Sequence, residues 1–264
     1  MVTFKQWVTR NPFLTSSLLT LASVFLLFLV KFALPQEGTL FNWPRLIVLN
    51  SISVAVVYLL ARFDWLHVSG LMEPVNKWHP RWLLLPLPLL ALALLSLTSA
   101  QLSLADYSPI RITAWLLSNF STGFFEEVLL RGFAFLLLWK AWGQTKKGIY
   151  KAAFVQALVF GLAHLGNLYD MPVIDVMAQV VFSTLIGFGF AGLTYLTRSL
   201  WPAIIIHMLI NCAGTFNDFF LSRPPEPFSP GIAGYAVIIV LFILFAALPG
   251  VVYLKRAKIR VSGS

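Results

Sequence analysis

Long apolar runs follow one another along this chain, and short polar segments separate them. A helix needs about 20 mainly apolar residues to cross the hydrocarbon core of a bilayer. No run alternates strictly enough to predict a strand of a membrane barrel. We expect spans over residues 13–34, 46–61, 82–100, 112–139, 149–165, 172–196, 200–220 and 232–254. The pattern predicts an all-α polytopic membrane protein, a bundle of about eight transmembrane helices.

The composition agrees with a protein whose solvent is largely lipid. Hydrophobic residues make up 59% of the 264 residues, charged residues only 11%, and the mean hydropathy is +0.83. A soluble domain cannot bury so large an apolar fraction. We expect one membrane domain over 1–264, with membrane lipids as its surroundings. Cys212 is the sole cysteine, which excludes an intramolecular disulfide.

The net charge of +9 would suggest nucleic-acid binding in a soluble protein, but here the basic residues lie in short loops. Cytoplasmic loops of membrane proteins hold an excess of Lys and Arg. With the N-terminus inside, alternate segments contain Lys5, Arg10, Arg62, Lys77, Arg81, Lys140, Lys146, Lys147, Lys151, Arg198, Lys255, Arg256, Lys258 and Arg260. The other loops contain only Arg45, Arg111 and Arg223. We therefore expect no nucleic-acid partner and both termini in the cytoplasm, with the protein in the plasma membrane if it is bacterial.

Several polar side chains fall inside the expected spans, where they are costly. An ionisable group in the middle of a membrane costs about 2.5–3.5 kcal/mol on insertion scales, so it suggests a function. The fourth span holds Glu126, Glu127 and Arg131, the fifth ends at His164, and the seventh holds His207 and Asn211. Counted from the cytoplasmic ends at 1.5 Å per residue, Glu126 lies about 21 Å deep, His164 about 20 Å and His207 about 14 Å. These groups are expected to meet near the bilayer centre.

Helical spacing predicts different surroundings for the two glutamates. Glu127 and Arg131 are four residues apart, so their charges can neutralise each other within the bundle. Glu126 is rotated by about 100° from Glu127 and has no obvious cation of its own. Asn119 and Thr122 share its helix face. We interpret Glu126 as the functional carboxylate and the Glu127–Arg131 pair as structural.

The same residues form a plausible hydrolytic site. Glu126 and His164 can hold and deprotonate a water molecule, and His207 and Asn211 can donate hydrogen bonds to the oxyanion formed on an attacked amide. A glutamate and two histidines, here Glu126, His164 and His207, also match the ligands of a catalytic zinc. The chain has no His-Glu-x-x-His helix. A reaction without a cofactor and one that uses a divalent metal both stay open.

Three motifs, in order, resemble the CAAX-protease and bacteriocin-processing family of intramembrane endopeptidases, also called the Abi family. They are Glu-Glu-x-x-x-Arg at Glu126–Arg131, Phe-x-x-x-His at Phe160 and His164, and His-x-x-x-Asn at His207 and Asn211. The resemblance covers residues 112–220, the expected catalytic core. It implies that Glu126 and His164 activate water, that His207 and Asn211 stabilise the oxyanion, and that Glu127, Arg131 and Phe160 support the site.

The resemblance also implies a substrate class. Members of the family remove the last three residues of prenylated CAAX proteins, and bacterial members take part in peptide maturation or self-immunity. A cavity reached from the cytoplasm would suit a prenylated chain end or another membrane-associated peptide. The competing interpretations are a proton-coupled transporter, a haem protein with two histidine ligands, and a non-catalytic scaffold or bacteriocin self-immunity protein.

Overall fold

A computed structural model describes residues 4–34, 41–73, 80–97, 102–222 and 229–256. These residues form helices and connecting turns, and none of them belongs to a β-strand. The predicted all-α class is confirmed. Lys77, Arg223, Lys258 and Arg260, which contributed to the predicted orientation, lie outside the described residues, as does Ala100 at the predicted end of the third span.

Each of the eight apolar runs forms a helical segment. The segments are α2 (Pro12–Ala33), α3 (Trp43–Arg62), η2 (Pro80–Leu84) with α5 (Pro86–Ser96), α6 (Pro109–Glu127) with η5 (Val128–Phe135) and α7 (Leu136–Trp142), α8 (Lys146–Ala163), α9 (Val173–Thr197), α10 (Trp201–Gly214) with α11 (Phe216–Phe220), and α12 (Gly231–Phe242) with η7 (Ile243–Ala247) and α13 (Leu248–Arg256). Short helices add α1 (Phe4–Arg10), α4 (Leu66–Ser69), η4 (Leu102–Leu104) and η6 (His164–Tyr169).

Not every segment is an uninterrupted apolar span. By length and composition, 5 helical stretches of the described chain can cross a membrane, and the helices at Trp82–Leu95 and Trp201–Gly214 are apolar but shorter. The segment from α6 to α7 is long but contains five charged residues, Arg111, Glu126, Glu127, Arg131 and Lys140. Two predicted spans are not single continuous α-helices. The fifth changes to a 3-10 helix at His164, and the seventh is interrupted at Thr215.

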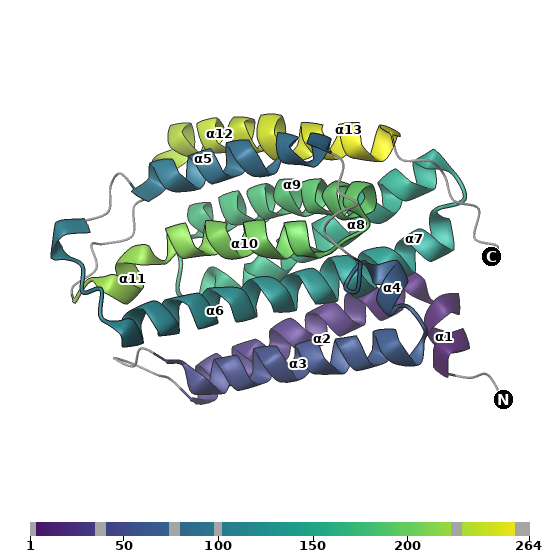
Figure 1. Cartoon of the computed structure of the whole chain (residues 1–264), viewed down its shortest axis with the longest axis horizontal. Coiled ribbons are helices and arrows are strands. Elements are labelled where there is room, and N and C mark those ends of the chain that lie inside the picture. The colour runs from purple at the N-terminus through teal and green to yellow at the C-terminus, as the bar shows by residue number, and fades with distance from the viewer. Residues whose placement is uncertain (1–3, 35–40, 74–79, 98–101, 223–228, 257–264) are drawn as a thin grey trace.

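The helices that carry the three motifs lie in the middle of the bundle (Figure 1). Helix α10 packs against α6 and α5, and α9 packs against α8 and α13. Helices α2 and α3 cover the other side of α6 and η5. The helix that starts the chain, α1, and the last helix, α13, end at the same end of the bundle, on the right in Figure 1.

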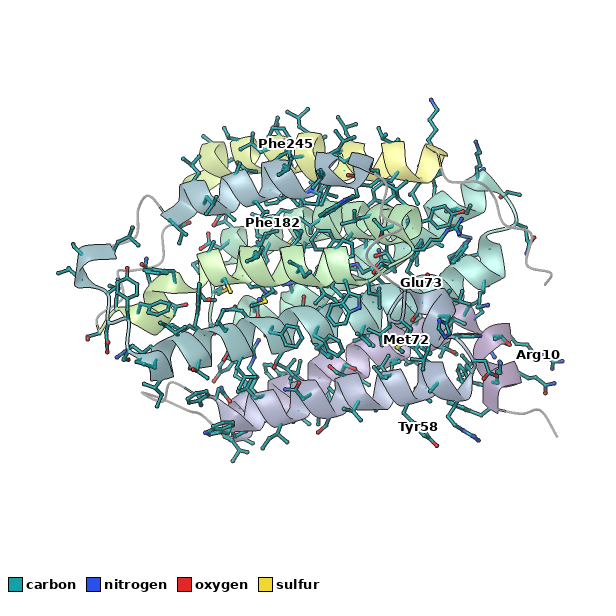
Figure 2. All side chains as sticks on the ribbon, in the orientation of Figure 1. Arg10, Tyr58, Met72, Glu73, Phe182 and Phe245 are labelled. Carbon is teal, nitrogen blue, oxygen red and sulfur yellow. The ribbon has the colours of Figure 1, made fainter. Side chains whose placement is uncertain are left out.

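Apolar side chains cover the outside of the bundle (Figure 2). Tyr58 and Val54 on α3 are 61% and 69% exposed, and Ile232 at the start of α12 is 77% exposed. A protein in water rarely exposes contiguous apolar surfaces of this extent, whereas lipid contacts them at no cost. The chain is an integral membrane protein.

Glycines let the central helices approach each other closely. A Cβ atom on Gly192 of α9 would come within 2.8 Å of the Gly250 carbonyl oxygen on α13. A Cβ atom on Gly123 would lie 3.1 Å from the Met208 backbone nitrogen, so this glycine brings α6 against α10. The small residues of α9 thus act in two places. Gly189 and Gly192 face α13, whereas Ser183 and Gly187 face the site.

Candidate active site

The Glu-Glu motif occupies the point where α6 becomes a π-helix. Helix α6 ends at Glu127, and the wider turns of η5 continue to Phe135. Single π-helical turns within α-helices often occur at functional sites. Every residue from Glu127 to Leu138 is buried, whereas Glu126 is partly exposed. The two carboxylates therefore leave one helix in different directions, as the helical spacing predicts.

A network of buried charged side chains supports the site. The Arg131 Nη1 atom donates to Glu127 Oε1 at 2.8 Å, and both side chains are 0% exposed. The same Oε1 atom lies 2.7 Å from His207 Nδ1. The Glu127 carboxylate, paired with the Arg131 guanidinium, accepts this hydrogen bond, and His207 Nδ1 donates it. The predicted pair is present, and it also orients the histidine of another helix.

Aromatic rings and a glycine enclose the guanidinium of Arg131. Its central carbon lies 5.0 Å from the ring centre of Phe160 and 5.5 Å from that of Phe190. Gly187 leaves room for it, since a Cβ atom there would lie 3.1 Å from Arg131 Nη2. Phe160 thus supports the site by contacting the cation of the network, and its ring also packs edge-on against His164.

Glu126 faces the opposite ring nitrogen of the same histidine. Its Oε2 atom lies 3.3 Å from His207 Nε2, and its side chain is 21% exposed. The imidazole of His207 therefore lies between the two glutamates, with one nitrogen in the buried network and the other toward the cavity. Helical spacing could not indicate this contact, because it tests only neighbours on the same helix.

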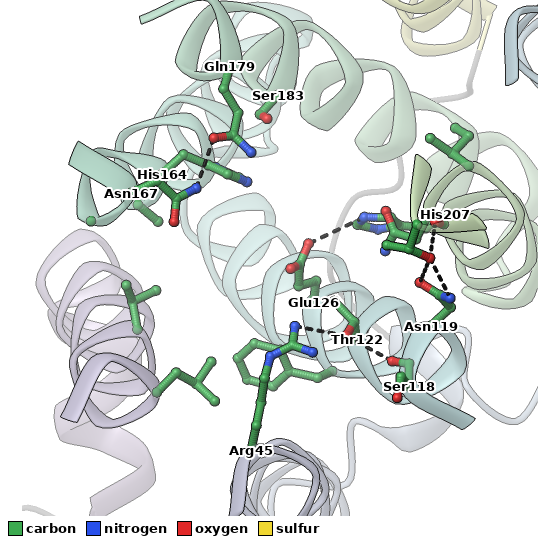
Figure 3. A pocket seen from close by; sticks show the side chains of 18 of the residues that line it. Arg45, Ser118, Asn119, Thr122, Glu126, His164, Asn167, Gln179, Ser183 and His207 are labelled. Atoms are coloured by element: carbon green, nitrogen blue, oxygen red, sulfur yellow. Dashed lines mark hydrogen bonds and ion pairs between the residues drawn. The ribbon is translucent and has the colours of Figure 1, made fainter. Parts of the chain in front are cut away.

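His164 lies on the far side of the cavity from His207 (Figure 3). Its Nδ1 atom is 3.0 Å from the Phe160 carbonyl oxygen, which can only accept, so Nδ1 carries the proton. The neutral ring then leaves Nε2 free to accept a proton. Within the described chain, His164 and Glu126 form no ion pair within 4.0 Å. They line the same cavity, and a molecule between them would contact both.

The remaining polar groups complete the cavity wall around Glu126. Asn211 lines it from α10, and no described residue forms a hydrogen bond with its side chain. Asn119 donates to Thr215 Oγ1 at 3.0 Å, which ties α6 to the end of α10. Thr122 completes the predicted stripe on α6. The amide of Asn211 is thus available to a ligand, one helical turn from His207.

Arg45 is a residue of this site that we did not predict from the sequence. Its Nη2 atom donates to Thr122 Oγ1 at 3.1 Å, and its charge interacts with that of Glu126 (Figure 3). Asn42 caps the start of α3 by accepting from the Arg45 backbone N–H at 3.0 Å, which fixes Arg45 in the first turn. The sequence places Arg45 beside an expected span end, and only the packing of α3 on α6 turns it inward.

These groups line one cavity of about 1150 Å³. Its walls come from α2, α6, α8 with η6, α9, and α10 with α11, and Arg45 enters from α3. Such a volume accommodates a peptide segment as well as water. All four predicted catalytic residues, Glu126, His164, His207 and Asn211, line it, whereas the supporting Glu127 and Arg131 lie beneath it.

The predicted zinc ligands are not gathered into a coordination site. Among the described residues, no three His, Cys, Asp or Glu side chains come together as metal ligands. Both nitrogens of His207 already face carboxylates, and His164 stands across the cavity. This arrangement does not fit a metal held by Glu126, His164 and His207, so the reaction derived below contains no metal step.

Comparison with known families identifies the central part of the chain. Residues 108–213 match the family described as type II CAAX prenyl endopeptidase Rce1-like. No curated protein matches the chain. The matched segment contains all seven residues of the three motifs and ends just after Asn211. The resemblance to the CAAX-protease family is thereby confirmed.

Proposed function

Because residues 108–213 match the family of type II CAAX prenyl endopeptidases, we propose that this protein is an intramembrane endopeptidase with Glu126 as its catalytic carboxylate. The observation that carries the proposal is the meeting of Glu126, His164, His207 and Asn211 on one cavity. We propose that residues 112–220 form the catalytic core of a single membrane domain. The substrate is a membrane-associated peptide, and a prenylated chain end is the class that the family implies.

The proposed reaction starts with water between Glu126 and His164. Glu126 takes a proton from the water, and the hydroxide oxygen bonds to the carbonyl carbon of the scissile amide. His164 Nε2 is the second acceptor that aligns the water. This step needs only groups that face the cavity.

The opposite wall stabilises the negative charge that develops on the carbonyl oxygen. The Asn211 amide and a protonated His207 Nε2 donate hydrogen bonds to it. The buried Glu127 carboxylate favours the positive charge on His207, and Arg131 keeps that carboxylate in place. When the C–N bond breaks, the protonated Glu126 returns its proton to the leaving amine. Water has then been added across the bond, and the enzyme is restored.

Peptide cleavage by the purified protein tests this function. Wild type and Glu126→Gln in detergent are incubated with prenylated and unmodified peptides, with and without a chelator, and the products are identified by mass spectrometry. The matched control is Asp64→Asn, which removes an exposed carboxylate far from the cavity at a left-handed position (φ 60°) that asparagine tolerates.

We expect cleavage by wild type and Asp64→Asn, loss of cleavage in Glu126→Gln, and no effect of the chelator. Loss with the chelator would instead support a metal-dependent reaction. Equal cleavage by Glu126→Gln would contradict the assigned role. A folded wild type that cleaves none of the peptides would favour the scaffold, self-immunity or transporter alternatives.

A further inference from the structure

The described residues that line the cavity all lie in one half of the bundle. On α10 and α11 the lining begins at His207 and continues to Phe219, and on α9 it stops at Ile186. On α2 it extends from Thr20 to Lys31. In each case these are the halves of the helices at the end of the bundle where α3, α6 and α9 begin. This end lies opposite α1 and the end of α13 in Figure 1.

The other end of the bundle is closed by packed side chains. Below Glu126, the helix is buried without interruption from Glu127 to Leu138. Phe135 and Leu138 pack there with Ile149 and Leu254 in one apolar cluster. No described residue of α7, of α13 or of the first half of α8 lines the cavity. Packed side chains therefore separate Glu126 from the end of the bundle at which α1 and the end of α13 lie.

Basic residues are concentrated at the closed end. The described residues there are Lys5, Arg10, Arg62, Lys140, Lys146, Lys147, Lys151, Arg198, Lys255 and Arg256. The described basic residues at the other end are Lys31, Arg45 and Arg111, and two of these form ion pairs, Lys31 with Asp170 and Arg111 with Asp106. The excess of Lys and Arg marks the cytoplasmic side of a membrane protein. This distribution places the closed end in the cytoplasm.

We propose that the cavity opens to the non-cytoplasmic face, so that the enzyme cleaves a membrane-associated peptide presented on that side. The inference rests on the proposed function and names where its substrate comes from. It replaces our expectation that the cavity is reached from the cytoplasm. The cavity and the termini lie at opposite ends of the bundle, so they cannot both face the cytoplasm. The substrate class becomes an exported or outer-leaflet peptide, in place of a chain end that arrives from the cytoplasm.

Single cysteines at the two ends test this orientation. In a Cys212→Ala background, Gly166→Cys reports the cavity, since Gly166 lines it and has open space for a side chain. Lys255→Cys reports the closed end. Intact cells and inverted vesicles are treated with a membrane-impermeant maleimide. We expect Gly166→Cys to react in intact cells and Lys255→Cys only in inverted vesicles. The reverse pattern, or reaction of both on one face, would overturn the inference.

A second measurement asks whether the labelled opening is the route of the substrate. A bulky maleimide added to intact cells should lower later cleavage by detergent-solubilised Gly166→Cys about tenfold or more, because it fills space that the peptide needs. The control is Gly214→Cys, which lies at the same end with open space but outside the cavity lining, and which should keep its activity. Full activity of labelled Gly166→Cys would contradict the proposed route.

Absence of cleavage by unlabelled wild type would refute the proposed function, while the labelling pattern would still decide the orientation.

Discussion

Glu126 and Glu127 are adjacent in the chain, yet the regions around them differ in exposure, in packing and in the polar groups they contain. Around Glu126 lie polar groups with spare hydrogen-bonding capacity and a cavity of about 1150 Å³. Around Glu127 lie a buried guanidinium, two aromatic rings and no exposed surface. One region can bind a ligand and change its protonation, whereas the other is already filled. A single histidine, His207, connects them.

The comparison teaches how a membrane protein can keep a reactive carboxylate in place. A charge inside the bundle is costly unless it is paired. Glu127 and Arg131 form a buried ion pair, and Glu127 also orients His207 through its hydrogen bond to Nδ1. Glu126 has a longer contact of 3.3 Å with His207 and faces the cavity. Mutations in the two regions should therefore separate activity from stability.

The largest effect is expected on activity when Glu126 is replaced by glutamine. Removal of a general base lowers the rate about 10²–10⁴-fold. Stability should change by less than about 1 kcal/mol, because the carboxylate is partly exposed and its pairing with His207 is weak. Cleavage kinetics and thermal unfolding of the same preparation measure both quantities. A large loss of stability would show that Glu126 belongs to the structural region.

The reverse result is expected for Arg131→Met. It leaves the buried Glu127 carboxylate without its cation, which costs about 3–5 kcal/mol. The double variant Glu127→Leu with Arg131→Met should recover much of that stability, since it removes both buried charges. Its activity should stay low, because His207 then has no acceptor for its Nδ1 proton. A double variant that is as unstable as Arg131→Met would contradict the account of the network.

Local helical geometry explains what could be predicted from the sequence. Four residues separate Glu127 from Arg131, and the pair forms at 2.8 Å. The depth count placed Glu126, His164 and His207 near one level, and all three line one cavity. Periodicity and apolar run length also identified all eight helical segments. These features depend on a residue's own helix and on the thickness of the membrane.

The features that were missed depend on how distant helices pack. Nothing near Arg45 in the sequence indicates that α3 turns it toward Thr122. The contact of His207 with both glutamates needs α10 to approach α6, and the missing side chain of Gly123 permits that approach. The depth count likewise gave a level in the membrane but no direction of opening. The direction of the opening follows only from the positions of the cavity-lining residues along each helix.

A smaller effect should follow from shortening Phe160. Phe160→Leu removes the ring that faces the Arg131 guanidinium at 5.0 Å. A cation–π contact of a desolvated arginine contributes about 0.5–2 kcal/mol. Because the same ring contacts His164, activity should also fall, whereas Phe190→Leu removes the other ring over Arg131 and leaves His164 untouched. Unfolding and cleavage measured on both variants distinguish the two roles. Equal activities would show that Phe160 acts only through Arg131.

The smallest effect is expected at the contact between α6 and the end of α10. Asn119 donates to Thr215 Oγ1 at 3.0 Å, and Asn119 is only 4% exposed. A hydrogen bond between neutral groups contributes about 0.5–1.5 kcal/mol, and the partner left behind adds a desolvation cost. Asn119→Ala and Thr215→Val should therefore each destabilise the protein modestly, and the double variant by less than the sum. A double-mutant cycle on unfolding measures this coupling.

Since the contact lies beside Asn211, each single variant should also weaken cleavage while leaving the cleaved bond unchanged. Additive stabilities with unchanged cleavage would mean that the wall next to Asn211 is held by the backbone of α10 alone.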